Sequence, residues 1–175
     1  QTYGVSGRYD TGFAIKKLSD GNFIIVGTKC LGPSVNTNGK GYLIKIDSTG
    51  NTIWSKFYGT NIEHELVNIY ELSNYQIIAA GSVQLSSGPT KFAGWLLKTN
   101  SIGDTVWTHK YLYDSTVTAS QDYFWDFIPT SDNGFLMAGM TNSANLFTQE
   151  AWLLKVDSMG CCYPGCIPVG ISENT

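Results

Sequence analysis

Two acidic side chains flank aromatic ones in one short stretch of the chain, at Asp122, Tyr123, Trp125 and Asp126. Paired carboxylates supply the acid and the base or nucleophile of glycoside hydrolysis, and aromatic rings beside acids offer a flat platform to a sugar. Aromatic residues are also common in strands, where they pack in the core. The stretch is therefore a candidate glycan-binding site, with core packing of its rings as the structural alternative.

The histidines do not complete a recognisable catalytic arrangement. The serine-hydrolase pattern G-x-S-x-G is absent from the sequence. His64 stands between Glu63 and Glu65, a polar triplet typical of a surface loop, and His109 is expected at an edge or surface position of a strand. We therefore expect a protein that is not an enzyme, with no catalytic residue and no cofactor. The alternative is part of a hydrolase or lyase whose catalytic residues lie outside this segment.

The four cysteines are candidates for disulfide bonds. Cys161, Cys162 and Cys166 are close together near the end of the sequence, and Cys30 stands alone near its beginning. Structural zinc sites need two pairs of cysteine or histidine at short spacings, which this chain does not offer, so no metal site is expected. A disulfide in an oxidising compartment is the favoured interpretation, and unpaired thiols are the second.

Composition and charge exclude several classes of partner. Only 14% of the 175 residues are charged, against roughly 25% in average domains. The net charge of -3 provides no basic surface for a phosphate backbone, so nucleic acid is not an expected partner. No apolar run approaches the ~20 residues of a membrane-spanning helix, so no membrane span is expected. The high aromatic content of 13% together with 19 glycines favours strands joined by tight turns.

One motif of two apolar segments around a polar turn occurs three times, at 41–54, 94–107 and 151–160. Lys45, Lys98 and Lys155 mark equivalent positions, 53 and 57 residues apart. Trp54 matches Trp107, which predicts core packing for these rings and likewise for the matched pair formed by Trp95 and Trp152. A period of this length indicates a repeat protein.

A second repeated segment lies before each motif, at 20–27, 74–81 and 132–139, and consists of a polar turn and a short apolar run that ends at glycine. A further strand is expected before each turn, at 13–18, 67–72 and 125–130. One unit is thus four short antiparallel strands, with variable loops at 28–40, 82–92 and 140–150 between the second and third strands. Radial repetition of four-stranded units is typical of β-propellers. We predict an all-β, β-propeller-like array of about three antiparallel blades, with blade ranges 5–59, 60–112 and an incomplete 113–160.

Both ends of the repeat region are incomplete. Residues 1–4 align with residues 56–59, the end of a fourth strand of a preceding blade, and the prolines in the tail at 161–175 disfavour a regular fourth strand in the last blade. The N-terminal strand could complete the last blade within one ring. Because propellers usually have four to eight blades, we favour part of a larger or oligomeric propeller, completed by other blades or by another chain.

The repeated pattern resembles the propeller repeats of large secreted bacterial surface proteins that carry a C-terminal sorting domain of the type IX secretion system. It consists of Asp-Gly-x-Phe-Ile-Ile-x-Gly, then Trp-Leu-Leu-Lys-x-Asp-Ser-x-Gly, then Trp and Tyr-Gly. The resemblance covers residues 1–160, with 161–175 similar to a linker, and the sorting domain itself is absent. It implies a secreted or cell-surface location.

The resemblance also implies O-glycans on a serine or threonine that follows aspartate, with Thr105, Ser115 and Ser158 as candidates. The alternative is that these residues simply form turns. The expected function is a non-enzymatic structural, adhesive or protein-interaction segment, with surface proteins or glycans as possible partners. A glycan- or protein-binding module that uses the loops between strands is the alternative.

Overall fold

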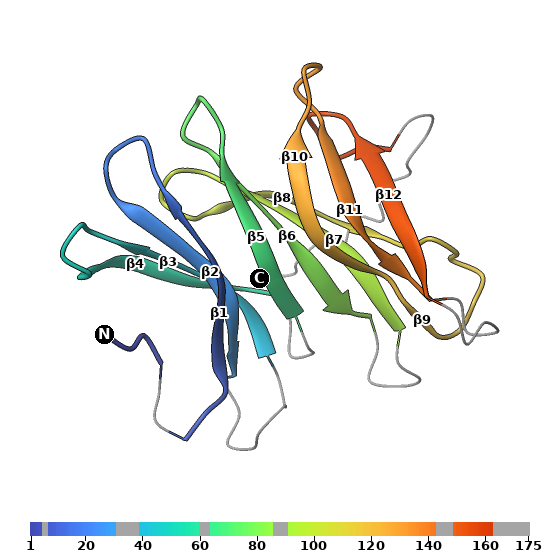
Figure 1. Cartoon of the computed structure of the whole chain (residues 1–175), viewed down its shortest axis with the longest axis horizontal. Helices are drawn as coiled ribbons and strands as arrows, with labels where there is room; N and C mark the ends of the chain where they lie inside the picture. The colour runs from blue at the N-terminus through green and yellow to red at the C-terminus, as the bar shows by residue number, and fades with distance from the viewer. Residues whose placement is uncertain (5–6, 31–38, 60–63, 86–90, 143–148, 163–175) are drawn as a thin grey trace.

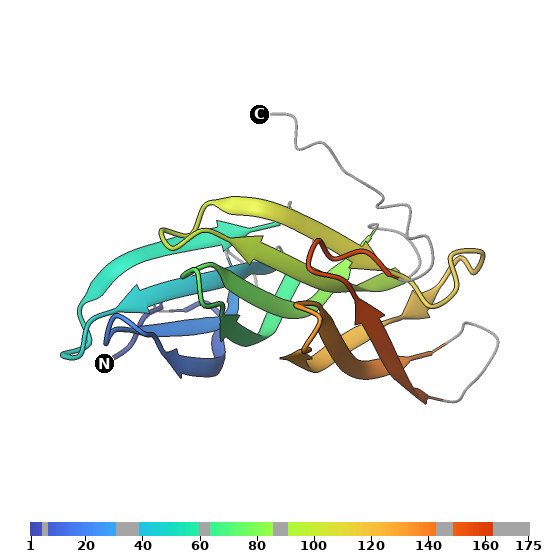
Figure 2. The same cartoon turned by 90° about the horizontal axis from the view of Figure 1, so that it is seen from above.

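The computed structural model describes residues 1–4, 7–30, 39–59, 64–85, 91–142 and 149–162. These residues form an all-β structure of three sheets that stand side by side in a row (Figures 1 and 2). Every strand pairing within the sheets is antiparallel except that of the two-residue strand β9. The predicted all-β class with antiparallel sheets is confirmed. Across the described part of the chain, no helix is long and apolar enough to cross a membrane.

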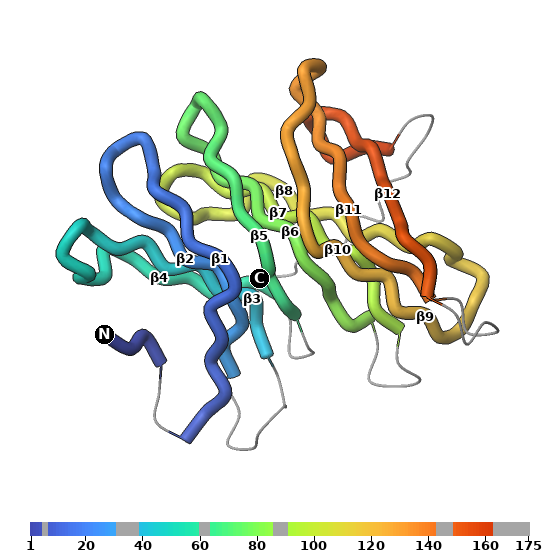
Figure 3. Tube along the Cα trace, viewed as in Figure 1, coloured from blue at the N-terminus to red at the C-terminus, as the bar shows by residue number. Residues whose placement is uncertain are grey.

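The first sheet has the order β1 (Asp10–Lys17), β2 (Phe23–Cys30), β3 (Gly39–Ile46) and β4 (Thr52–Tyr58). The second sheet has the order β5 (His64–Glu71), β6 (Ile77–Gln84), β7 (Lys91–Thr99) and β8 (Thr105–Tyr111). The third sheet contains β10 (Tyr123–Pro129), β11 (Phe135–Thr141) and β12 (Glu150–Val156), and β9 (Ser120–Gln121) pairs with β7. Figure 3 shows the β1-β2, β5-β6 and β10-β11 hairpins projecting toward the same end of the molecule.

The strands extend two to three residues further into the predicted loops than expected. Thr28 to Cys30 continue β2, where they pair with Gly39 to Gly41, and Ser82 to Gln84 continue β6 in the same way. Small and polar residues at these positions look like loop residues in the sequence. They form strands because the neighbouring strand satisfies their backbone hydrogen bonds.

Two kinds of turn recur at equivalent positions. The first joins the first two strands of each sheet and contains a residue with positive φ, which is Gly21 (86°), Tyr75 (64°) or Asn133 (63°). The second follows the third strand and ends at Gly50 (91°), Gly103 (84°) or Gly160 (81°). Glycine adopts positive φ without steric cost, and asparagine tolerates it. Tyr75 is the strained member of the first set.

A bulge in the first strand of each sheet explains the glycine that recurs in the second strand. The pairing slips by one residue between Gly12 and Ala14, and at the equivalent places in β5 and β10. A Cβ atom on Gly27 would lie 1.9 Å from the Thr11 carbonyl oxygen, and the same approach occurs at Gly81 (2.0 Å) and Gly139 (1.8 Å). Only glycine fits, because the bulged strand passes so close.

The sheets are held together through their faces. We call the face of a sheet that points toward the preceding sheet its near face, and the opposite face its far face. The near face of the first sheet is the equivalent one, which carries Tyr42 and Ile44. Ile24, Val26 and Leu43 on the far face of the first sheet pack against Trp95 and Leu97 on the near face of the second. A second core joins the far face of the second sheet to the near face of the third, through the residues Ile78, Ala80, Leu96, Phe124, Phe135, Met137 and Trp152.

The tryptophans follow the predicted core packing in part. Trp95 and Trp152 are buried, and Trp54 and Trp107 are half-buried against the two cores. Trp125 is different, because it occupies the bulge of β10 and is 52% exposed. Core packing, the structural alternative for this stretch, therefore does not hold for Trp125, and its neighbour Phe124 is the buried ring instead.

Candidate functional site

The Asp122 carboxylate is part of the interior rather than of an open binding surface. Its side chain is 0% exposed and accepts hydrogen bonds from Thr141 Oγ1 (2.6 Å), the Tyr113 backbone N–H (3.2 Å) and Ser120 Oγ (3.3 Å). Burial raises the pKa of Asp122, and the hydrogen bonds oppose that shift. These contacts tie the segment before β10 to the end of β11, so Asp122 positions the chain.

The Asp126 carboxylate connects two sheets. Its Oδ1 accepts a hydrogen bond from the Phe127 backbone N–H at 2.7 Å and another from Asn68 Nδ2 of β5. Asn68 and Asp126 both follow the bulge of their strand, so they occupy equivalent positions in neighbouring sheets. The structure thus gives both acids of the predicted cluster intramolecular partners.

The rings of Tyr123 and Trp125 do lie together. Their centroids are 5.6 Å apart with an interplanar angle of 12°, and Tyr123 also contacts Phe92 of the second sheet at 5.2 Å. The two parallel rings, one of them exposed, are the part of the predicted cluster that offers a surface to a ligand. Phe13, which occupies the bulge of β1, is the equivalent exposed ring of the first sheet.

The structure gives the candidate glycosylation residues exposed positions, all in or beside turns. Thr105 begins β8, Ser115 precedes β9, and Ser158 lies in the turn after β12. The aspartates before the hydroxyl residues have a clear structural role. Asp157 Oδ1 accepts hydrogen bonds from the backbone N–H groups of Met159 and Cys161, both at 2.8 Å.

The equivalent turn after β3 has the same construction. Asp47 accepts hydrogen bonds from the Thr49 hydroxyl (2.7 Å) and the Asn51 backbone N–H (2.8 Å). The Thr49 hydroxyl, together with the Asn51 groups, lowers the pKa of Asp47 to about 2. An aspartate at this position therefore holds the turn as an acceptor in its charged form.

The cysteines differ in state. Cys162 is disulfide-bonded, whereas Cys30 and Cys161 are free thiols. Cys30 is buried at the end of β2, where its backbone N–H donates to Asp10 Oδ1 at 3.2 Å. Cys166 lies outside the described residues. Within the described part of the chain, no group of three or more metal-ligating side chains comes together.

His64 contradicts the predicted surface loop. It begins β5, is 1% exposed, and its ring meets Trp95 edge-on at a centroid distance of 5.2 Å. A Cβ atom on Gly59 would lie 2.2 Å from the His64 ring, so the glycine makes room for it. Glu63 lies outside the described residues. His109, in the edge strand β8, contacts the Met159 carbonyl oxygen through Nε2 at 2.8 Å.

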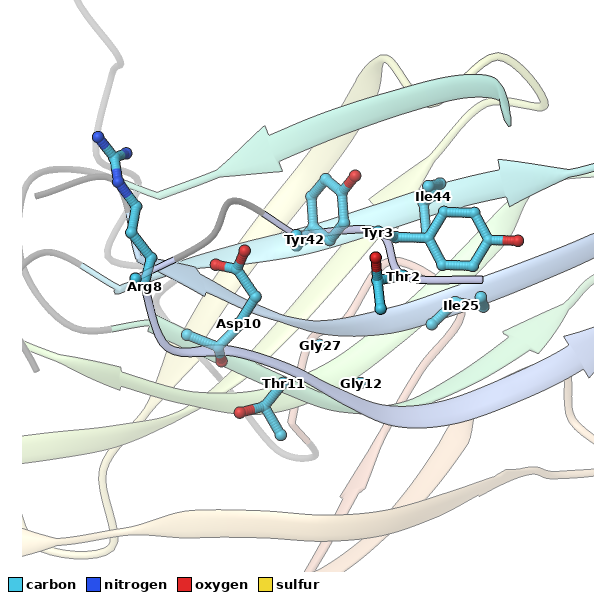
Figure 4. A pocket seen from close by; sticks show the side chains of 13 residues that line it. Thr2, Tyr3, Arg8, Asp10, Thr11, Gly12, Ile25, Gly27, Tyr42 and Ile44 are labelled. Carbon is cyan, nitrogen blue, oxygen red and sulfur yellow. The ribbon is translucent and has the colours of Figure 1, made fainter. Parts of the chain in front are cut away.

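A cleft lies on the near face of the first sheet, which the sequence did not single out (Figure 4). It has a volume of about 560 Å³, within the range of small-molecule pockets. Ile25, Tyr42 and Ile44 line it from the sheet, and the N-terminal segment adds the ring of Tyr3. Arg8 and other polar residues lie around its edge, with the Arg8 guanidinium at the end away from Tyr3 (Figure 4).

A hydrogen bond from a tyrosine hydroxyl to a turn glycine recurs three times. Tyr58 donates to the Gly103 carbonyl oxygen (2.6 Å), which joins the first sheet to the second. Tyr111 donates to the Gly160 carbonyl oxygen (2.7 Å), which joins the second sheet to the third. The third such bond runs from Tyr3 to Gly50 (2.8 Å). The aligned Tyr-Gly dipeptides at Tyr3 and Tyr58 were visible in the sequence, but the partners of these tyrosines were not, and Tyr111 is followed by leucine.

No protein-family model matches this chain, and a comparison with curated proteins finds no relative. The assignment of a function therefore depends on the geometry described above.

Proposed function

We propose that the chain is a segment of a β-propeller with a non-enzymatic structural, adhesive or protein-interaction role in a secreted or cell-surface protein. The observation that carries this proposal is the repeated sheet-to-sheet contact. The same tyrosine-to-glycine hydrogen bond and the same facing apolar positions join the first sheet to the second and the second to the third. Sheets that depend on their neighbours to bury a face are typical of repeat proteins.

The use of the acids supports a role without catalysis. Glycoside hydrolysis needs two carboxyl groups that face a common space. Asp122 is instead engaged with Thr141 inside the fold, and Asp126 is engaged with Asn68 of the neighbouring sheet. Both acids stabilise the arrangement of the sheets.

The location is tested on intact cells of the source organism. We expect antibodies raised against the chain to bind unbroken cells, or to detect the protein in the medium. External protease should remove the cell-bound signal while a cytoplasmic marker stays intact. Protein confined to the interior of the cells would contradict the proposed role.

A glycan-binding module is the second candidate, and the parallel pair formed by Tyr123 and the exposed Trp125 favours it. Such rings stack on the apolar faces of sugars. Binding to a glycan array that disappears in Trp125→Ala would support this function. Phe13→Ala is the matched control, since Phe13 is the equivalent exposed ring of the first sheet. Equal binding by both variants would contradict it.

A further inference from the structure

The two ends of the row of sheets present unmatched halves of the repeated contact. Leu43 and Leu96 occupy the same far-face position in the first and second sheets, and both are 0% exposed because the next sheet covers them. Leu153 occupies this position in the third sheet and is 68% exposed. Ala138 beside it is also exposed, whereas its equivalents Val26 and Ala80 are buried. The far face of the third sheet thus has the residues of a sheet-binding face.

The complementary half is the near face of the first sheet. Tyr42 and Ile44 occupy the positions that Trp95 and Leu97 occupy in the second sheet, where Leu43 and Ile24 of the first sheet cover them. In the first sheet the same place is the 560 Å³ cleft. The cleft therefore lies where aliphatic side chains of a preceding sheet would pack.

The N-terminal residues already occupy part of that preceding sheet. Tyr3 makes the hydrogen bond to Gly50 that Tyr58 and Tyr111, at the ends of β4 and β8, make to the next sheet. In the described structure, residues 1–4 belong to none of the three sheets. They are positioned as the last residues of a fourth strand.

In the described residues, the edge strand β12 of the third sheet has one bridge to the segment that follows it. The bridge between Val156 and Cys162 is equivalent to the pairs formed by Ile46 with Thr52 and by Thr99 with Thr105, where β4 and β8 begin. Among the described residues, β12 has no further partner on this edge. Cys162 thus corresponds to the start of a fourth strand, and residues 1–4 correspond to the end of one.

We propose that the chain associates head to tail with a second copy, an inference that rests on the propeller segment proposed above. The far face of the third sheet in one copy packs on the near face of the first sheet in the other. Residues 1–4 of that second copy then pair with β12. Two such contacts close a ring of six sheets, within the usual range of four to eight blades. Heterologous contacts of this kind close only when the rotation between copies permits it.

The register of the existing sheets fixes which residues meet. Leu43 pairs with Lys56 and Leu96 pairs with His109. Gln1 aligns with Lys56, since Tyr3 aligns with Tyr58. Leu153 of one copy therefore lies opposite Gln1 of the other, and antiparallel neighbours of this kind have Cα atoms about 4.5–5.5 Å apart. This separation is close enough for an engineered disulfide.

A second copy explains more of the structure than a small ligand in the cleft. A ligand would fill the cleft and leave Leu153 exposed. A second copy covers Leu153 and fills the cleft through a packing of sheet faces that the molecule already uses twice. A copy of the same chain satisfies both features, because it carries both of the complementary faces.

The experiment combines sedimentation velocity with crosslinking of the whole chain. We expect a species of twice the 19.2 kDa chain mass at micromolar concentration. The double variant Gln1→Cys and Leu153→Cys, made with Cys161→Ser to remove a free thiol, should form a dimer with disulfide-linked chains. The matched control replaces Leu153→Cys with Val106→Cys, an exposed residue of the middle sheet, and should not crosslink efficiently.

Leu153→Asp should convert the dimer to a monomer, with a circular dichroism spectrum that shows intact strands. Val106→Asp should leave the dimer unchanged. A monomer at all concentrations, or an oligomer that does not crosslink through Gln1 and Leu153, overturns the head-to-tail contact. Either result leaves the proposed surface function standing, because that function is tested on cells by location.

Discussion

The two contacts between sheets share one geometry but are filled by different kinds of side chain. Between the first and second sheets the core is mainly aliphatic, with Leu66, Ile69 and Val83 around Trp95. Between the second and third sheets it is richer in aromatic residues, with Phe124 stacked on Trp152 at 4.7 Å. The polar contacts differ as well. The comparison shows that the backbone arrangement and the tyrosine-to-glycine bond define the contact. Side chains of different shapes can fill the space between the two sheets.

The largest effect is expected at the centre of the aromatic contact. Phe124→Ala removes a fully buried ring that contacts both Trp152 and Tyr111, and it should lower the free energy of unfolding by about 3–5 kcal/mol. Urea denaturation followed by circular dichroism measures this change. A loss below about 1 kcal/mol would mean that the third sheet does not depend on this contact.

A smaller loss is expected from adding volume at Gly94. A Cβ atom at this position would lie 2.4 Å from the Phe124 ring, so Gly94→Ala should cost about 1–3 kcal/mol. The double variant with Phe124→Leu should cost less than the sum of the two single changes, because the ring that clashes is gone. Strict additivity in urea denaturation would show that the two residues do not interact.

The tyrosine-to-glycine bonds should contribute about 0.5–1.5 kcal/mol each, measured as the loss in Tyr58→Phe and in Tyr111→Phe. Burial raises the pKa of both tyrosines above the ordinary value of 10. The neutral hydroxyl is therefore favoured in the folded chain, and its contribution is complete below about pH 10. As the pH rises above 10, tyrosine ionises in the unfolded chain and stability falls.

Tyr58→Phe and Tyr111→Phe should each reduce the fall in stability above pH 10, and the variant that carries both changes should reduce it most. Urea denaturation at a series of pH values from 8 to 11 makes the comparison. If the stability of the variant with both Tyr58→Phe and Tyr111→Phe falls as steeply above pH 10 as that of the parent, other groups cause the fall.

The smallest change in stability is expected from the exposed polar interactions between sheets. These interactions differ between the two sheet-to-sheet contacts. Lys56 forms an ion pair with Asp104 between the first and second sheets, whereas His109 contacts a backbone carbonyl oxygen between the second and third. Lys56→Met should lower the melting temperature less than Tyr58→Phe, and the difference from the parent should shrink in 1 M salt because surface charges are screened. His109→Met at pH 8 should show no such salt dependence.

The same ion pair predicts a response to acid. Hydrogen bonding and charge from Lys56 hold the pKa of Asp104 below its ordinary value of 3.8. The pair therefore contributes to stability above about pH 4, and the contribution declines as the pH falls further. The difference between Lys56→Met and the parent should become smaller at pH 3, and a larger difference there would contradict the assignment.

The sequence predicted the features that depend on local residue types. The hairpin turns were recognisable because Asp20 to Gly21 and Asp47 to Gly50 contain the residues that such turns need. The repeat then gave the strand order within each unit. These features could be predicted because short-range backbone geometry selects particular residues.

Features that depend on register could not be predicted in the same way. The bulge in β10 inserts one residue, so the inward ring is Phe124 and the outward ring is Trp125. The burial of His64 depends on Trp95, a residue of another strand, and on space left by Gly59. In the candidate cluster, the hydrogen bonds of Asp122 come from Thr141 and Tyr113, and no sequence spacing indicates them.

The short strand β9 affects how load would pass between the second and third sheets. It pairs with β7 on one side, and Gln121 exchanges backbone hydrogen bonds with Asn142 beyond β11 on the other. Asp122 anchors the same segment through Thr141. The connection from Tyr111 to Tyr123 is thus fixed at its C-terminal part, where it acts as a rigid coupling instead of a hinge. A pulling force on the third sheet would have to break this coupling before the two sheets could separate.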